Sequence, residues 1–232
     1  LCRAMQLKSI KKLVIDEVDV MLDLGFRFQL TNIFELLPKN RQNIMFSATM
    51  TDAIEELIIQ FFTGVEKISV AVSGTPLENI SQTSYAVPNF YTKVNLVVEL
   101  LKDVEEFKKV LIFVGNKKRA DLLFSELEEF YSEEICVIHS NKTQNYRLRS
   151  IRQFDEGKNR ILVTTDVMAR GLDLDKISHV INFDTPTFPE NYMHRIGRTG
   201  RAEEKGKSIL LYTEDENVHK LSIEKLMDMQ ID

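Results

Sequence analysis

Short apolar runs alternate with segments of helical periodicity along almost the whole chain. Strands that alternate with helices in sequence usually form a mostly parallel sheet. The pattern therefore predicts an α/β fold in which helices cover both faces of parallel sheets. The runs that we expect to be strands are Leu13–Ile15, Ile44–Phe46, Ile68–Val72, Val110–Val114, Ile135–Ile138, Ile161–Val163, Val180–Phe183 and Ile209–Tyr212.

Helical spacing is clearest in two of the intervening segments. Apolar residues recur at positions 54, 57, 58, 61 and 62, and again at positions 120, 123, 124 and 127. This spacing places the side chains on one face of a helix. Near the C-terminus, Thr213 is followed three residues later by Glu216, a capping-box pair that predicts the start of a last helix.

The stretch Ser73–Gln82 reads as a linker, because it contains a glycine and a proline and few apolar residues. The region before it holds three of the predicted strands. The longer region after it holds the other five, in regular alternation with helical segments. The sequence therefore predicts a first region 1–72, a linker 73–80 and a second region 81–232.

The composition is that of an ordinary globular protein, with 44% hydrophobic and 28% charged residues in 232. The net charge of −5 argues against a generally basic surface, so any nucleic-acid contact must come from local clusters. Two such clusters occur. His139–Arg160 holds six basic and two acidic residues, and His194–Lys207 holds five basic and two acidic residues.

The two cysteines, Cys2 and Cys136, have no zinc-site spacing, and they indicate neither a disulfide framework nor a metal site. No segment approaches about 18 consecutive apolar residues, and no signal peptide is visible. These features predict a protein of the reducing cytoplasm with no membrane partner.

Two acids, Asp16 and Glu17, directly follow the first predicted strand in the stretch LVIDEVD. Ligands of open α/β sheets bind at the carboxyl ends of strands. One acid can hold Mg²⁺ there while the other orients or deprotonates a water molecule, which is the chemistry of nucleotide hydrolysis. A solvated acidic turn is the alternative. After the second predicted strand, Ser47 and Thr49 of FSATM have helix capping as their commoner role.

Two later stretches indicate phosphate chemistry. In ILVTTDVMARGLDLD, Ile161–Asp175, backbone N–H groups and hydroxyls at a strand end can hold a phosphate, and Asp173 can accept hydrogen bonds from a ribose. In HRIGRTGR, His194–Arg201, glycines allow close approach of the backbone and arginines grip phosphate at two points. The alternative for Ile161–Asp175 is an ordinary strand–helix loop. The alternative for His194–Arg201 is a solvated basic loop.

Together these stretches resemble the ordered motifs of the DEAD-box RNA helicases. DEVD at 16–19, SAT at 47–49, ARGLD at 169–173 and HRIGRTGR at 194–201 resemble motifs II, III, V and VI. LIFVGNKKRAD at 111–121 resembles motif IV, and HSNKTQNYR at 139–147 resembles the family's Q-x-x-R segment. The resemblance implies two RecA-like domains that clamp ATP and single-stranded RNA. Only the last part of the first domain lies in 1–72, whereas 81–232 forms a complete second one.

The resemblance also implies roles in ATP hydrolysis. By position, Asp16 holds Mg²⁺ through water and Glu17 positions the attacking water. Arg198 and Arg201 act as arginine fingers on the γ-phosphate. Such fingers contribute about 10³–10⁵ in rate.

Further roles follow from the same resemblance. Gly171 and Asp173 lie at the nucleotide, with Asp173 on the ribose, and Arg147 and Thr165 contact the RNA backbone. The residues implied to couple the nucleotide and RNA sites are Asp19, Ser47, Thr49 and His194.

The sequence departs from the family pattern in two ways. Val18 stands where the family usually has alanine. The phosphate-binding loop G-x-x-x-x-G-K-[ST], which precedes motif II in the family, is absent, and the similar stretch Gly200–Ser208 has five residues between its glycines instead of four. That stretch also leads into a predicted strand, whereas the family's loop opens a helix.

We therefore expect an ATP-dependent RNA helicase represented by a chain that lacks its N-terminal portion and is inactive alone. The alternative is a non-catalytic RNA-binding or interaction module built on the second domain. A DNA-directed helicase is disfavoured by the fit of HRIGRTGR and SAT to the RNA family. The expected ligands are ATP, Mg²⁺ and single-stranded or duplex RNA, and the sequence predicts no oligomeric state.

Overall fold

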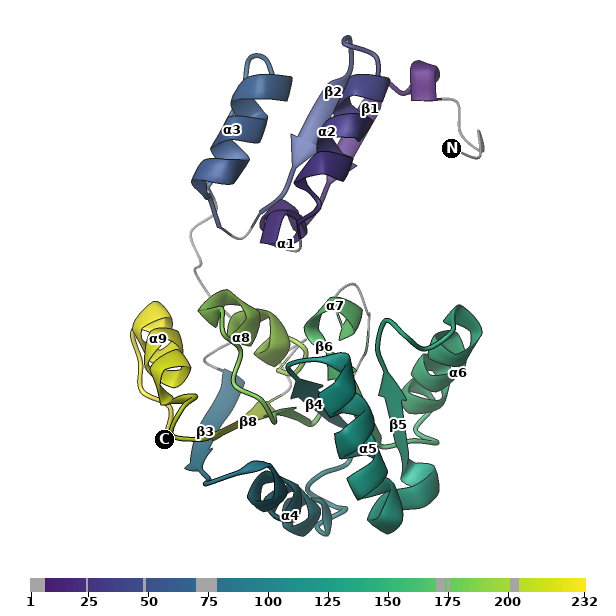
Figure 1. Cartoon of the computed structure of the whole chain (residues 1–232), viewed down its shortest axis with the longest axis vertical. Helices are drawn as coiled ribbons and strands as arrows, with labels where there is room; N and C mark the ends of the chain where they lie inside the picture. The colour runs from purple at the N-terminus through teal and green to yellow at the C-terminus, as the bar shows by residue number, and fades with distance from the viewer. Residues whose placement is uncertain are drawn as a thin grey trace. The chain divides into compact units, whose positions relative to one another are not determined.

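The chain folds into two compact units, Leu1–Ala71 and Val72–Asp232 (Figure 1). Each unit has its own hydrophobic core. The structure is a computed structural model, and it describes residues 7–23, 25–47, 49–69, 79–169, 174, 176–200 and 205–232. In this described part of the chain, no helix is both long and apolar enough to cross a membrane.

The first unit is built on two parallel strands, β1 (Lys12–Ile15) and β2 (Gln42–Met45). A short 3₁₀ helix, Leu7–Ser9, precedes β1. The three helices are α1 (Val18–Asp23), α2 (Arg27–Leu36) and α3 (Asp52–Phe61). The helix predicted from the apolar spacing at 54–62 is thus confirmed as α3. Its buried residues join those of β1, α1 and α2 in one core formed by Ile15, Val18, Leu30, Phe34, Ile54 and Leu57.

Much apolar surface of the first unit remains uncovered. Val14 and Ile44, which are paired across the two strands, are 58% and 36% exposed. Beside them lies a hollow of about 220 Å³ lined by Leu13, Val14, Ile15, Asp16, Met21, Leu30, Ile33 and Phe34. Two strands alone are marginally stable in water. The first unit therefore gains little stability from its sheet.

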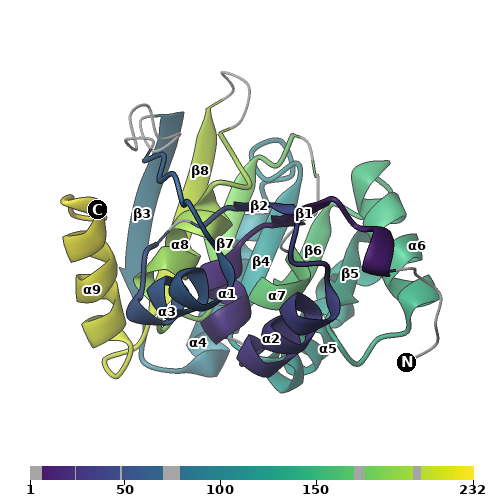
Figure 2. The same ribbon diagram turned by 90° about the horizontal axis from the view of Figure 1, so that it is seen from above.

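The second unit contains a six-stranded, entirely parallel sheet in the order β3-β8-β7-β4-β6-β5. Figure 2 shows the strands following one another in this order. The sheet and its helices confirm the predicted α/β fold class. The strands are β3 (Ile80–Ala86), β4 (Val110–Val114), β5 (Ile135–Ile138), β6 (Ile161–Thr165), β7 (His179–Asn182) and β8 (Gly206–Tyr212).

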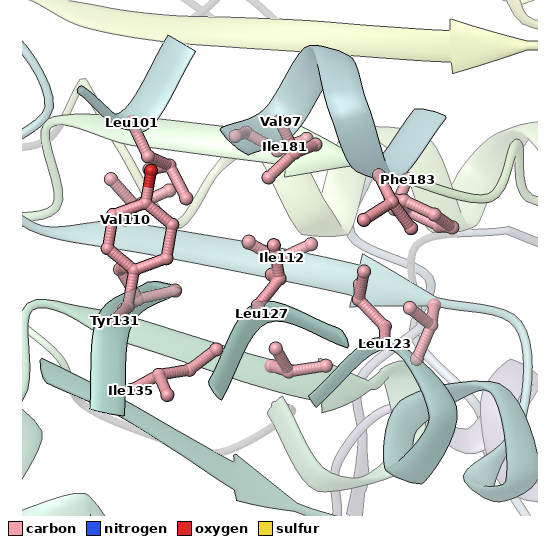
Figure 3. Packing of buried hydrophobic residues seen from close by; sticks show 14 of the residues in the cluster. Val97, Leu101, Val110, Ile112, Leu123, Leu127, Tyr131, Ile135, Ile181 and Phe183 are labelled. Atoms are coloured by element: carbon pink, nitrogen blue, oxygen red, sulfur yellow. The ribbon is translucent and has the colours of Figure 1, made fainter. Parts of the chain in front are cut away.

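Helices cover both faces of this sheet. One face packs against α4 (Phe90–Leu101) and α5 (Lys117–Tyr131), and Figure 3 shows their side chains meeting those of the strands. A short 3₁₀ helix, Ser132–Glu134, follows α5. The helices on the other face are α6 (Gln144–Asp155), α7 (Asp166–Ala169), α8 (Pro189–Ile196) and α9 (Asn217–Met227).

The central strand β4 explains this two-sided burial. All five of its residues are buried, with Val110, Ile112 and Val114 in the core under α4 and α5. Leu111 and Phe113 belong to the core on the opposite face. A strand buried on both faces reads as a continuous apolar run, which is typical of parallel sheets.

Three sequence predictions differ from the structure. The predicted linker Ser73–Gln82 runs too far, because β3 begins at Ile80. Ser81, Gln82, Thr83 and Ser84 are polar, as an edge strand allows, and they hide the strand from a search for apolar runs.

The predicted strand Ile68–Val72 is also not confirmed. Ile68 and Ser69 have no strand structure, Ile68 is 83% exposed, and residues 70–72 lie outside the described residues. An alternating sequence such as ISVAV favours a strand, but a strand forms only where another strand offers hydrogen bonds. No such partner adjoins Ile68 in the described part of the chain.

The last helix starts later than the capping box predicts. α9 begins at Asn217, and Glu216 itself occupies the capping position. The Glu216 carboxylate nevertheless accepts hydrogen bonds from the Thr213 N–H at 2.8 Å and the Thr213 hydroxyl at 3.2 Å. The pair thus closes the turn before the helix instead of opening the helix.

Candidate functional site

The two acids after β1 sit on a sharply turned backbone. Glu17 has φ of +51°, the left-handed region that side chains rarely adopt, and its N–H donates to Asp16 Oδ1 at 2.9 Å. This turn leads from the end of β1 straight into α1 and leaves the Asp16 side chain exposed. Strained conformations of this kind cluster at functional sites. Both carboxylates therefore lie where the sequence analysis placed them, at the carboxyl end of a strand.

Asp19 joins the ends of the two strands. Its buried carboxylate accepts hydrogen bonds from the Thr49 N–H at 3.0 Å and the Thr49 hydroxyl at 3.1 Å. Ser47 in turn donates from its hydroxyl to the Thr49 carbonyl at 2.6 Å. The capping alternative for Ser47 and Thr49 is wrong, since α3 has Thr51 at its cap and no side-chain cap bond.

Asp16 is a suitable partner for Mg²⁺ and a poor one for a fully protein-bound metal. Among the described residues, no group of three or more His, Cys, Asp or Glu side chains could surround a metal ion. Mg²⁺ usually keeps several waters and binds one or two carboxylates together with substrate phosphates. A single exposed carboxylate beside a water-accessible acid matches that preference.

In the second unit, one predicted RNA-contacting residue ends β6 and the other contacts the helix that follows it. Thr165 is the last residue of β6, and α7 follows it directly. Arg147 of α6 donates from Nη1 to Met168 Sδ of α7 at 3.2 Å and from Nη2 to the Gln144 side chain. Its Nε is buried and has no hydrogen-bond partner among the described residues. Arg147 is thus held beside the segment that follows Thr165.

The arginine-rich stretch closes α8 and the turn after it. His194 lies in the last turn of α8, and the half-buried Arg198 donates from Nε to the His194 carbonyl at 3.2 Å. Both residues line a small hollow that also touches Asp166 and Ala169 of α7. The predicted residues Gly171, Asp173 and Arg201 lie outside the described residues.

Two acids that the sequence analysis did not single out hold the carboxyl end of this sheet together. Asp184, just past β7, accepts two hydrogen bonds from Arg119 at 2.6 and 2.7 Å and one from the Gly115 N–H at 2.8 Å. Asp166 forms an ion pair with Arg195 at 2.6 Å. Both acids directly follow or closely follow strands, as Asp16 does. This position after a predicted strand is the sequence signal by which they could have been identified.

A buried lysine joins the same end of the sheet. Lys93 of α4 donates to the Phe183 carbonyl at 2.7 Å and to the Glu216 carboxylate at 2.5 Å. Burial lowers the pKa of the Lys93 ammonium, although Glu216 and Asp184 act in the opposite direction. Lys93 therefore links the ends of β7 and β8 to α4.

The basic surface on this unit is smaller than the sequence count indicates. Arg149 and Arg152 of α6 are exposed, and Tyr146 has the cations of Lys142 and Arg149 each 5.6 Å from its ring centre. Arg160 does not belong to this surface. Its guanidinium donates to the carbonyls of residues 101 and 107 and pairs with Glu134 at the amino end of β6.

Comparisons with known proteins agree with the motifs. The DEAD/DEAH box helicase family model matches residues 1–57, and the helicase conserved C-terminal domain model matches residues 92–203. The DEAD-box ATP-dependent RNA helicase CshA of Bacillus cereus is 36% identical over 231 residues, which cover 99% of this chain and 43% of CshA. The chain therefore spans less than half the length of this relative.

Solved structures give the same result. S. cerevisiae Dbp5 bound to RNA and ADP BeF3 matches with a TM-score of 0.83 and 34% identity, over 95% of this chain and 58% of Dbp5. The E. coli DEAD-box protein SrmB bound to regulator of ribonuclease activity A matches with a TM-score of 0.62 and 34% identity. That match covers 66% of this chain and 88% of the SrmB chain.

Proposed function

Since this chain belongs to the DEAD-box helicase family, we propose that it supplies catalytic and RNA-binding residues of an ATP-dependent RNA helicase that works in the cytoplasm. The observation that carries the proposal is the end of β1, where two adjacent carboxylates stand on a strained turn and Asp19 is bonded to Thr49. In this proposal residues 1–72 belong to a first RecA-like domain, residues 73–79 are the linker, and β3 opens the second domain.

The proposed roles in hydrolysis follow from the chemistry of phosphoryl transfer, which depends on positioning and on stabilising charge. Bound Mg²⁺ would neutralise charge on the ATP phosphates, and Asp16 would hold it through water. Glu17 orients the attacking water. Arg198 and Arg201 stabilise the negative charge that develops on the transferred phosphoryl group. The residues proposed to bind the rest of the nucleotide are Gly171 and Asp173.

The proposed RNA contacts lie at the carboxyl end of the six-stranded sheet. Arg147 and Thr165 contact phosphates, which gives affinity without sequence preference. Arg147 suits this role because its half-buried side chain is held beside α7, the segment that directly follows Thr165. The residues proposed to couple RNA binding to hydrolysis are Asp19, Ser47, Thr49 and His194.

RNA binding tests this assignment directly. We expect the 232-residue chain to bind a labelled single-stranded RNA weakly, and Arg147→Ala to reduce both the affinity and its salt dependence. Each lost phosphate contact on a single strand flattens the slope of log K against log salt by about 0.7. The control is Lys102→Ala, which removes an exposed cation just after α4. An unchanged slope for Arg147→Ala would show that this side chain does not touch RNA.

A second candidate function is a non-catalytic RNA-binding module. The observation that favours it is that the second unit has a six-stranded sheet covered on both faces and itself carries Arg147 and Thr165. In that case Arg147→Ala would weaken RNA binding as described above, but no extension of the chain would produce ATP hydrolysis that depends on Glu17.

A further inference from the structure

Arg195 is the largest fully buried side chain among the described residues. It is 2% exposed, and its guanidinium bonds to Asp166 at two points, Nε to Oδ1 at 2.6 Å and Nη2 to Oδ2 at 2.8 Å. The remaining nitrogen, Nη1, donates to the Asp184 carbonyl at 2.7 Å and to Asn182 Oδ1 at 3.3 Å. The guanidinium also lies 5.1 Å from the centre of the Phe113 ring. One side chain thus joins α8 to the ends of β4, β6 and β7.

The energetic cost of burying the Arg195 guanidinium indicates that this side chain does more than stabilise the fold. Taking a charged pair out of water costs about as much as the pair returns, so a buried ion pair is weak evidence for stability. A guanidinium bonded at two points does, however, fix the distance and direction of its partner. The geometry of Arg195 and Asp166 therefore favours a role in placing the backbone segments that carry them.

Those two segments carry the groups of the proposed site. Asp166 directly follows Thr165, which ends β6, and Arg195 lies between His194 and Arg198. A shift of Asp166 would move the neighbouring Thr165, and a rotation of α8 would move both His194 and Arg198. Because the Arg195 side chain spans the two segments, neither can shift without breaking a charged hydrogen bond.

We propose that Arg195 is a positioning residue that fixes Thr165 relative to His194 and Arg198 through its two-point bond to Asp166. The inference rests on the proposed function, since it takes Thr165 as an RNA contact and Arg198 as a phosphate contact. Arg195 itself touches neither ligand. Its effect on RNA binding passes through the position of Thr165.

The chain contains a matched control for this role. Arg160 is a mostly buried arginine whose side chain is 10% exposed, with an acidic partner in Glu134, two backbone carbonyl acceptors and an aromatic ring 5.3 Å away, that of Tyr131. It precedes β6, whereas Thr165 ends that strand. Arg160→Lys and Arg195→Lys thus each remove guanidinium bonds to an acid and to backbone carbonyl oxygen, near opposite ends of one strand.

The first experiment measures RNA affinity and melting temperature of the 232-residue chain for each variant. We expect Arg195→Lys to lower the affinity for single-stranded RNA about tenfold, the effect of a lost charged hydrogen bond. Arg160→Lys should lower the melting temperature similarly and change the affinity less than about twofold. Asp166→Asn, which keeps the size of the side chain, should lower the RNA affinity as Arg195→Lys does. It replaces Arg195→Lys in the experiment if Arg195→Lys fails to fold.

The second experiment separates positioning from a general loss of structure by a double-mutant cycle with Thr165→Ala. If Arg195 acts through Thr165, then Thr165→Ala lowers the affinity less in the Arg195→Lys background than in the original chain. In the Arg160→Lys background, Thr165→Ala should lower the RNA affinity as much as it does in the original chain.

Additive effects of Arg195→Lys and Thr165→Ala, or equal losses of affinity in Arg195→Lys and Arg160→Lys at matched melting temperature, would overturn the proposal. Normal RNA affinity in both Arg147→Ala and Thr165→Ala has a different meaning. It would refute the RNA site itself and, with it, the role given to Arg195.

Discussion

Glu17 has a strained backbone conformation and is also the residue proposed to orient the attacking water. Its positive φ turns the chain from β1 into α1, and its N–H donates to the Asp16 carboxylate. The sequence analysis identified both acids correctly as a strand-end pair, because an apolar run followed by acids is a local pattern. It could not predict the bond from Thr49 to Asp19, which depends on how β1 and β2 are paired.

Glycine at position 17 should stabilise the first unit. Left-handed backbone costs little for glycine, so we expect Glu17→Gly to raise the free energy of unfolding by about 0.5–1 kcal/mol. Glu17→Val, with a branched side chain at the same φ, should lower it by about 1 kcal/mol or more. Urea unfolding followed by circular dichroism measures both changes. A Glu17→Gly variant less stable than the original chain would show that the turn carries no strain.

The burial of Arg195 and its bond to Asp166 could not be predicted from the sequence. The sequence analysis counted it as one more positive charge in HRIGRTGR. Its burial follows from the packing of α8 against the sheet, which brings Asp166 from 29 positions away to the guanidinium. A count of charges cannot separate such a buried side chain from its half-buried neighbour Arg198.

Among the elements, the central strand β4 was predicted well, whereas β3, one of the two edge strands, was missed. β4 is buried on both faces and is apolar throughout, so its five residues were predicted without error. β3 lies at the edge of the sheet, where solvent tolerates polar side chains, and its sequence ISQTSYA resembles a loop. The difference is physical, since only burial on both faces forces an apolar run.

The first residue of β7 makes the stability of the second unit depend on pH. His179 is 3% exposed, stacks on Phe107 at 4.1 Å between ring centres, and has Glu106 and Lys207 nearby. Burial lowers the pKa of the His179 imidazole, and Lys207 lowers it further, although Glu106 raises it. The unfolded chain therefore takes up a proton at higher pH than the folded chain does.

We expect the His179 contribution to be complete above pH about 6.5 and to be lost as the pH falls from there towards the folded pKa. At pH 5.5 the loss cannot exceed about 1.4 kcal/mol, the value for one pH unit. His179→Phe keeps a ring on Phe107 and should lose less stability than the original chain between pH 7.5 and 5.5. Urea unfolding at the two pH values decides this, and equal losses in both proteins would exclude His179 as the cause.

At the scale of the whole molecule, the two units differ in how completely they bury their apolar surface. The second unit has six strands covered on both faces, whereas the first leaves Val14 and Phe46 more than half exposed around two strands. The resemblance implied this inequality, since it placed only the last part of a first domain in residues 1–72. The outer bounds of both regions are close to those of the units, apart from the start of β3.

The first unit should unfold before the second. We expect two transitions in urea, and backbone amides of β1 and β2 should exchange with solvent faster than those of β4. Hydrogen exchange followed by mass spectrometry resolves the two regions. The comparison protein is the 232-residue chain extended by a DEAD-box relative's phosphate-loop segment. We expect the added segment to cover the apolar hollow and so to slow exchange in β1. Equal protection of β1 and β4 in the original chain would contradict this account.

The most direct test of the central claim is release of inorganic phosphate from ATP at saturating single-stranded RNA. We expect no RNA-stimulated release by the 232 residues alone, because the proposed carboxylates and arginine fingers cannot hold ATP in line for attack without a phosphate-binding loop. The extended chain should hydrolyse ATP, and Glu17→Gln or Arg198→Ala should each reduce that rate about 10³-fold or more. Robust turnover by the 232 residues alone, or undiminished turnover in the extended Glu17→Gln chain, would contradict the account.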